Sequence, residues 1–183
     1  MNAKVDLSET ILETPRLYLR PWRITDVDDF FEYASVDGVG QMAGWKPHEY
    51  KEESRQILNL FIEEKKTFAI ELKENGRVIG SFGIEEYNEN KFSGDFVNKQ
   101  GRELGYVLSK SYWGRGLIPE AVHKVVSYCF EELSYDFLTV GHFAWNEQSK
   151  RVIEKSGFRF YCEGEYETRM GIVEKDYSYV LHR

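Results

Sequence analysis

The sequence predicts a single domain of the α+β class, in which strands and helices are mixed along the chain. In several short stretches apolar residues alternate with polar ones, as in half-buried strands, while in others they recur every three to four residues, as in helices. Glycine, proline and asparagine separate these stretches. The 183 residues, 42% of them hydrophobic, are enough for one sizeable core, so we expect one domain over 1–183 with an N-terminal extension at 1–13.

The first elements are one strand and two helices. Residues 16–20 alternate and precede Pro21, which predicts a strand. The spacing of Thr25 and Asp28 fits a capping box at the start of a short helix. A second helix is expected over 49–65, where an apolar stripe faces inward.

Two strands of a hairpin follow, at 68–72 and 78–84. Between them, Asn75 and Gly76 can both adopt a positive φ, which favours a two-residue turn. A polar stretch at 88–101 then separates this hairpin from the second half of the chain.

The second half alternates strands with helices. Gly105, inside the strand predicted at 102–108, indicates a bulge or a close approach by another backbone. The remaining elements are expected as a helix over 117–133, a strand over 137–143, a helix over 147–155 that ends at Gly157, and strands over 158–163 and 177–181. The predicted order is β-α-α-β-β-β-α-β-α-β-β.

The composition narrows the class of function. A formal net charge of −7 argues against nucleic-acid binding, which depends on lysine and arginine. Cys129 and Cys162 lie in apolar surroundings, which favours reduced thiols in a cytoplasmic protein. No stretch is long and apolar enough to predict a membrane span, and the histidines lack the spacing of a metal site. We therefore expect no membrane partner and no metal.

The connection after strand 102–108 reads Tyr112-Trp113-Gly114-Arg115-Gly116-Leu117. Without Cβ atoms at its glycines, a ligand can approach the backbone, and the first N–H groups of the following helix have no internal partner. The helix dipole adds positive potential there, so the pattern favours a phosphate. The same pattern also occurs in tight connections that bind nothing. Pro119 stands where a dinucleotide fingerprint needs a third small residue, so a Rossmann site is not indicated.

Several separated motifs support a closer assignment. They are Thr14-Pro15-Arg16-Leu17, Glu103-Leu104-Gly105-Tyr106, the glycine loop with Glu120-Ala121, and Asn146, Ser149 and Glu154-Lys155-Ser156-Gly157-Phe158. In this order they resemble the GNAT superfamily of acyl-CoA-dependent N-acetyltransferases, and within it the RimJ/RimL branch that acetylates protein N-termini. The resemblance covers nearly the whole chain. It implies a mostly antiparallel, six- to seven-stranded mixed sheet, flanked by helices and splayed between the fourth and fifth strands.

The same resemblance implies acetyl-CoA as the acyl donor. Its pantetheine arm would pair with the fourth strand at Tyr106, Val107 and Leu108, and its pyrophosphate would rest on the glycine loop. The loop residues expected to take part are Trp113, Gly114, Arg115, Gly116 and Leu117. Arg115, Lys150 and Arg151 could reach phosphate oxygens, although each also fits a solvated helix surface.

Transfer from a thioester to an amine requires a neutral amine, a hydrogen-bond donor for the oxyanion and a proton for the thiolate. By resemblance, Glu103 is the candidate base, directly or through a water; alternatively it orients the acceptor amine or pairs with an arginine. A backbone N–H near Tyr106 or Val107 is the expected oxyanion donor. Many GNAT enzymes carry a tyrosine seven positions after the residue that corresponds to Asn146, but this chain has Ile153 there.

Asn146 and Ser149 are the remaining candidates near the reacting atoms. The resemblance suggests that Asn146 holds the pantetheine amide and that Ser149 hydrogen-bonds the sulfur. Both residues also fit the start of a helix, where asparagine and serine satisfy free N–H groups.

The acceptor is expected to be a protein N-terminal α-amino group or a small-molecule amine. The alternatives are a noncatalytic acyl-CoA-binding or sensing module, and a scaffold with a vestigial cleft. A homodimer is a further expectation, because an exposed strand edge and relatives that pair favour it.

Overall fold

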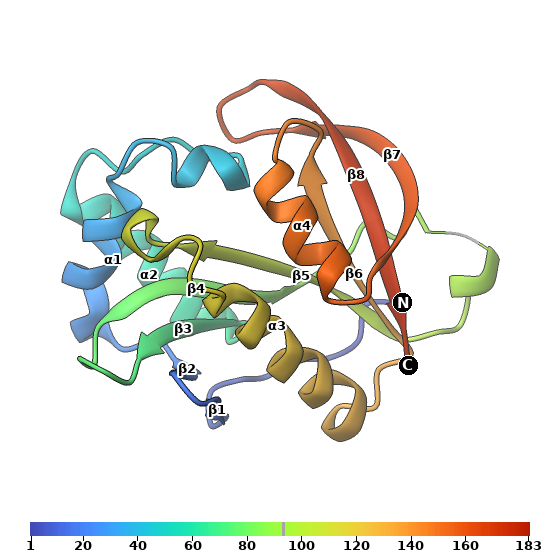
Figure 1. Cartoon of the computed structure of the whole chain (residues 1–183), viewed down its shortest axis with the longest axis horizontal. Helices are drawn as coiled ribbons and strands as arrows, with labels where there is room; N and C mark the ends of the chain where they lie inside the picture. The colour runs from blue at the N-terminus through green and yellow to red at the C-terminus, as the bar shows by residue number, and fades with distance from the viewer. Residues whose placement is uncertain (93) are drawn as a thin grey trace.

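The computed structural model describes residues 1–92 and 94–183. Eight strands form one mixed sheet in the order β1-β2-β3-β4-β5-β6-β8-β7 (Figure 1). The strands are β1 (Leu12–Glu13), β2 (Leu17–Pro21), β3 (Thr67–Leu72), β4 (Val78–Glu85), β5 (Gly101–Leu108), β6 (Phe137–Phe143), β7 (Arg159–Glu167) and β8 (Val173–His182). This confirms the mixed α+β class, and the sheet has one strand more than expected because the short β1 pairs with β2.

Four α-helices cover the two faces of the sheet. They are α1 (Val27–Ala34), α2 (Lys51–Glu64), α3 (Leu117–Ser127) and α4 (Glu147–Lys155). Because side chains alternate along a strand, Ile70 of β3 packs in the cluster that contains α3, while Ala69 packs in the cluster that contains α1 and α2. None of the helices in residues 1–92 and 94–183 is long and apolar enough to cross a membrane.

The sheet is antiparallel except where β5 meets β6. These two strands run parallel and pair from Gly101↔Phe137 to Leu104↔Val140, while β5 stays paired with β4 up to Leu108 and β6 stays paired with β8 up to Phe143. Figure 1 shows β5 and β6 diverging beyond these pairs. The predicted splay between the fourth and fifth strands of the sequence is therefore confirmed.

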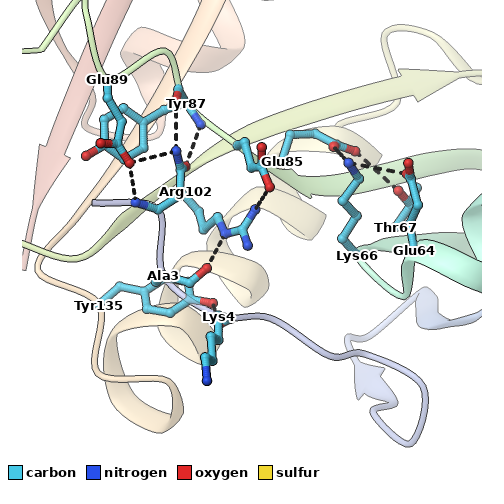
Figure 2. A network of polar contacts seen from close by, with 12 residues as sticks. Ala3, Lys4, Glu64, Lys66, Thr67, Glu85, Tyr87, Glu89, Arg102 and Tyr135 are labelled. Atoms are coloured by element: carbon cyan, nitrogen blue, oxygen red, sulfur yellow. Dashed lines mark hydrogen bonds and ion pairs between the residues drawn. The ribbon is translucent and has the colours of Figure 1, made fainter.

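Residues 1–13 pack onto the base of the sheet. The Ala3 N–H donates to the Gly101 carbonyl at 3.1 Å, and the Arg102 Nε donates to the Ala3 carbonyl at 2.6 Å (Figure 2). The Tyr135 hydroxyl donates to the Lys4 carbonyl at 2.7 Å, in the same view. These contacts hold the paired end of β5 and β6, opposite to the splay.

Three local predictions were wrong. The carboxylate that caps the turn before α1 is Asp26, which accepts from the Arg23 N–H at 2.7 Å, while Asp28 pairs with Lys51. In the hairpin loop Gly76 has φ +69°, but Asn75 does not have a positive φ, and Leu72 pairs with Arg77 across a longer turn.

The third correction concerns Gly105, which makes no bulge, because the β4–β5 register is regular from Gly80↔Leu108 to Glu85↔Glu103. No other backbone of the described chain approaches it closely either, since a Cβ added there would meet only the Glu85 side chain, at 4.0 Å. The polar stretch 88–101 includes Ser93, which lies outside the described residues. Elsewhere in this stretch Phe92 and Phe96 are buried against Phe137.

Candidate active site

The register of β5 determines which backbone groups face the splay. Ser109 donates its N–H to the Ile79 carbonyl at 2.7 Å, and Gly80 pairs with Leu108. Since hydrogen-bonded residues alternate along an antiparallel ladder, the backbone groups of Val107 face β4 and those of Tyr106 and Leu108 face away from it. Trp113 Nε1 donates to the Leu108 carbonyl at 2.8 Å. The N–H groups of Tyr106 and Leu108 and the carbonyl of Tyr106 therefore point into the splay.

A narrow cleft of about 210 Å³ extends from the splay to the start of α3. Its lining includes Tyr106, Val107 and Leu108 from β5 and Asn146 and Ser149 from the start of α4. The glycine loop also lines it, through Trp113, Gly114, Gly116 and Leu117. Of the residues predicted for the cofactor, all except Arg115 therefore border one cavity.

The glycine loop has the backbone of an anion site. Gly114 and Gly116 have φ of +75° and +74°, a left-handed conformation that other residues rarely adopt. None of the turn, loop and cap backbone bonds in the described chain is donated by residues 114–118. These N–H groups precede and begin α3, whose dipole adds positive potential, so the loop can bind a diphosphate.

Side chains from the distant N-terminal segment brace this loop. The Glu120 carboxylate accepts from the Thr14 hydroxyl at 2.6 Å and from the Arg16 Nε at 2.7 Å. Arg16 also donates to the Arg115 carbonyl at 2.8 Å. The sequence motifs contain all of these residues, but neither helix periodicity nor turn chemistry indicates that they meet.

The three basic residues suggested for phosphate lie on exposed or half-buried surface. The Arg115 guanidinium lies over the Tyr112 ring, 5.0 Å from its centroid. Lys150 Nζ lies 3.9 Å from a Glu147 oxygen, and Arg151 Nε donates to the Glu147 carbonyl at 3.2 Å. In this structure each of the three side chains contacts a neighbouring residue on the protein surface. This agrees with the alternative that they are solvated surface residues.

Asn146 is the N-cap of α4 and is buried. Its Oδ1 accepts from the Ser149 N–H at 3.0 Å, and its Nδ2 donates to the Met42 carbonyl at 3.4 Å. The Ser149 hydroxyl lies 3.1 Å from the Tyr106 hydroxyl. From the sequence, only the backbone of Tyr106 is assigned a role. The contact of its phenol with Ser149 was missed, because strand periodicity does not show which residue of α4 lies against a strand side chain.

A wide cleft of about 650 Å³ opens on the face covered by α1 and α2. Glu103 lines it and accepts a hydrogen bond from the Thr139 hydroxyl at 3.3 Å. Burial raises the pKa of Glu103 to about 7; the charges of Asp176 and Glu85 act in the same direction, while Thr139 and Lys91 oppose it. Glu103 can therefore exchange a proton near neutral pH.

The rest of the wide cleft combines aromatic rings with carboxylates. Trp45, Phe61 and Tyr166 contribute rings, and Glu53, Glu85, Glu86 and Asp176 contribute carboxylates beside Glu103. Lys46 and Arg169 are the basic residues of the lining. Acidic side chains thus outnumber basic ones, which suits a cationic ligand.

The two histidines in this lining are both buried and hydrogen-bonded. His48 Nδ1 lies 2.7 Å from the Ser54 hydroxyl, and burial lowers the pKa of His48. His142 Nδ1 donates to the Phe143 carbonyl at 2.8 Å. Within residues 1–92 and 94–183 no three histidine, cysteine or acidic side chains gather as a metal site would require.

The two clefts meet at four residues that line both of them, namely Met42, Tyr106, Val107 and Ser149. The glycine loop, whose N–H groups can hold an anion, therefore lies in one of the two adjoining clefts, and Glu103, with a pKa of about 7, lies in the other. This arrangement can hold a phosphate-bearing donor on one side of the sheet and an amine on the other.

Comparisons with known proteins agree with this geometry. The family model described as an acetyltransferase (GNAT) domain matches residues 16–159. The uncharacterized N-acetyltransferase YoaA of Bacillus subtilis is 30% identical over 155 residues, which are 81% of this chain and 82% of that protein.

Solved structures share the fold at lower sequence identity. A GNAT-family acetyltransferase from Bacillus anthracis superposes with a TM-score of 0.79 at 21% identity, over 94% of this chain and 98% of that one. The microcin C7 self-immunity acetyltransferase MccE, solved with acetyl-CoA and AMP, has a TM-score of 0.75 at 13% identity, over 93% and 94% of the two chains.

Proposed function

Since the chain belongs to the GNAT acetyltransferase family and is an acetyl-CoA-dependent N-acyltransferase, we propose that it transfers the acetyl group directly to a primary amine in the wide cleft. The observation that carries this proposal is the meeting of the two clefts at Tyr106 and Ser149. The thioester of a donor in the narrow cleft would lie at this junction, within reach of an amine in the wide cleft, so no covalent enzyme intermediate is needed.

The narrow cleft is the proposed site of acetyl-CoA. The pyrophosphate would accept hydrogen bonds from the backbone N–H groups around Gly114 and Gly116. The pantetheine amides would pair with the Tyr106 carbonyl and the Leu108 N–H, because these groups point into the cleft. Val107 contributes its side chain, since its peptide groups face β4.

The Tyr106 N–H is the proposed donor to the oxyanion. It is the backbone donor of β5 that faces the junction of the two clefts, and its direction is fixed by the strand pairing on its other side. A fixed donor of this kind stabilises charge that develops in the transition state.

Glu103 is the proposed base, directly or through a water. A carboxylate with a pKa near 7 is ionised often enough at neutral pH to accept a proton from an ammonium group, and basic enough to retain it. An α-amino group, with a pKa of about 7.7 to 8.0, gives up its proton to this base more readily than a lysine side chain, with a pKa of about 10.4.

The acceptor class proposed is a protein N-terminal α-amino group, with a small-molecule amine as the alternative. The motifs shared with the RimJ/RimL branch favour the N-terminus, and the aromatic and acidic lining of the wide cleft is compatible with both. A homodimer in the cytoplasm is part of the same proposal. The edge strand β7 leaves Phe160 and Tyr166 exposed, which gives a second copy apolar surface to contact.

The test is release of coenzyme A thiol from acetyl-CoA with a panel of N-terminal peptides, polyamines, amino acids and aminoglycosides. We expect thiol release that depends on at least one amine, with one acetylated amine formed per thiol. Tight acetyl-CoA binding without release by any amine would instead indicate a noncatalytic sensing module. Absence of acetyl-CoA binding would contradict the assignment of the narrow cleft.

A further inference from the structure

We propose that Tyr106 and Ser149 form a proton relay that delivers the proton required by the departing thiolate of coenzyme A. The inference rests on the proposed function, because it concerns the second half of the same transfer. It assigns the acid role to a strand residue, at a site where the helix position Ile153 has no exchangeable side-chain proton.

The position of the two hydroxyl groups carries the proposal. The Tyr106 and Ser149 hydroxyls are 3.1 Å apart and come from β5 and the first turn of α4, on the two sides of the splay. Of the four residues that line both clefts, these two are the ones with exchangeable side-chain protons. Both hydroxyls are therefore beside the point where donor and acceptor meet.

Other proton sources are poorly placed. Within the described lining of the narrow cleft, the titratable side chains are Tyr106 and Tyr112. Tyr112 belongs to the glycine loop, where its ring faces the Arg115 guanidinium, so it lies at the pyrophosphate end. Glu103 lies in the wide cleft and is the proposed base, so it accepts the proton of the amine and does not supply one to the sulfur.

The Tyr106 phenol can act as an acid because it stays protonated. Burial raises the pKa of Tyr106 to about 12, so its hydroxyl keeps its proton throughout the neutral range. The phenol is therefore present in the protonated form that a general acid requires.

In the proposed transfer every bond that forms is matched by one that breaks. The amine nitrogen forms a bond to the thioester carbonyl carbon, and its proton goes to the Glu103 carboxylate. As the carbon–sulfur bond breaks, the sulfur takes the hydroxyl proton of Ser149, and the Ser149 oxygen takes that of Tyr106. The phenolate then regains a proton from water in the wide cleft while Glu103 releases one, so the products are the acetylated amine and the free thiol.

The experiment compares Tyr106→Phe, Ser149→Ala and the double variant with wild type, using acetyl-CoA and the amine of the panel that gives the fastest thiol release. General acid catalysis contributes about 10²- to 10⁴-fold, so each single variant should lower kcat by at least about 10²-fold. Binding of acetyl-CoA, measured by calorimetry, should stay within about threefold of wild type, because neither hydroxyl is needed to hold the pyrophosphate.

The relay also predicts that the two losses are not additive. Residues that act as one unit give a double variant about as slow as the slower single variant, within about threefold. Replacing Tyr106 with a ring-fluorinated tyrosine restores the hydroxyl and should recover most of kcat. The matched control is Tyr128→Phe, which removes a tyrosine hydroxyl 3.3 Å from Thr10 Oγ1 outside both clefts and should leave kcat unchanged.

Three results would overturn the relay while leaving the proposed function intact. They are a kcat near wild type in either single variant, multiplicative losses in the double variant, or no recovery with fluorotyrosine. If wild type itself releases no thiol with any amine, the proposed function fails and the relay fails with it. A kcat near wild type in Ser149→Ala overturns the relay even if Tyr106→Phe does not fold.

Discussion

The Asn146 side-chain nitrogen donates a hydrogen bond to the Met42 carbonyl oxygen at 3.4 Å, and this contact joins the start of α4 to the turn at Gly40–Ala43. Met42 lines both clefts, so the contact lies at their common border. The same asparagine caps α4 through its oxygen. One side chain therefore combines a helix cap with a link across the mouth of the splay.

Two variants of Asn146 separate these roles. Asn146→Ala removes both bonds and should lower the free energy of unfolding by about 1 kcal/mol, as loss of an N-cap does. Asn146→Asp keeps the capping oxygen but cannot donate to Met42, so thermal unfolding should show most of the stability retained. Its KM for the amine should rise several-fold. An unchanged KM in Asn146→Asp would mean that the link to Met42 does not shape the wide cleft.

Gly114→Ala tests the anion site of the loop. A Cβ at this position meets no atom within 4 Å, so the cost arises from its φ of +75° alone, about 1 kcal/mol. Any shift of the loop misdirects its N–H groups, and calorimetry should show acetyl-CoA binding weakened by about tenfold or more.

Gly76→Ala is the matched control for that change. Gly76 also has a positive φ, +69°, and open space around it, but it lies in the β3–β4 loop. It should show the same loss of stability with unchanged acetyl-CoA affinity. Equal losses of affinity in both variants would refute a specific role for the glycine loop.

Glu103→Gln should change both turnover and its pH dependence. With a pKa near 7, the carboxylate is lost as the pH falls below neutrality, so kcat of wild type should drop on the acid side. The glutamine variant should lose about 10²-fold in kcat and lack this limb. Exposed Glu63→Gln is the control, and a variant at 103 with an unaltered pH profile would exclude Glu103 as the base.

The same substitution should stabilise the fold at neutral pH. Because the pKa of Glu103 is raised, the folded chain binds more protons than the unfolded chain between about pH 4.5 and 7, and stability falls as the pH rises through this window. Glutamine removes that loss, so its free energy of unfolding at pH 7.5 should exceed that of wild type by about 3 kcal/mol. At pH 4.5 the two proteins should be nearly equal in urea denaturation.

Arg16→Ala tests the brace behind the glycine loop. The variant loses the bonds to Glu120 and to the Arg115 carbonyl, so KM for acetyl-CoA should rise about three- to tenfold while kcat at saturation stays near wild type. Arg55→Ala, which breaks the exposed pair with Glu52, is the control and should alter neither quantity. A lowered kcat with an unchanged KM in Arg16→Ala would contradict the brace.

Much of the fold could be predicted from periodicity. The strand at 137–143 and the helix at 147–155 were predicted at the bounds of β6 and α4, because both have unambiguous patterns and clear stop signals. The hairpin turn was less accurate, since Asn75 and Gly76 permit several turns and the bulge after Ile70 selects the longer one. The short β1 was missed because two residues carry no periodicity.

The candidate site was predictable only where it is local in sequence. The glycine loop and the N-cap at Asn146 can be recognised from neighbouring residues. The pairing of Tyr106 with Ser149 depends on how α4 packs over β5, and no periodicity encodes that distance. The direction of the Val107 backbone similarly follows from the register with β4.

We expect acetyl-CoA in the narrow cleft to donate its acetyl group directly to an amine in the wide cleft. The most direct measurement is mass spectrometry of the amine panel after incubation with wild-type protein and acetyl-CoA, with thiol release followed in parallel. We expect an acetylated amine formed in equal amount to the free thiol, and we expect this product to be lost in Glu103→Gln. Thiol release without an acetylated amine, or no release with any amine despite acetyl-CoA binding, would contradict it.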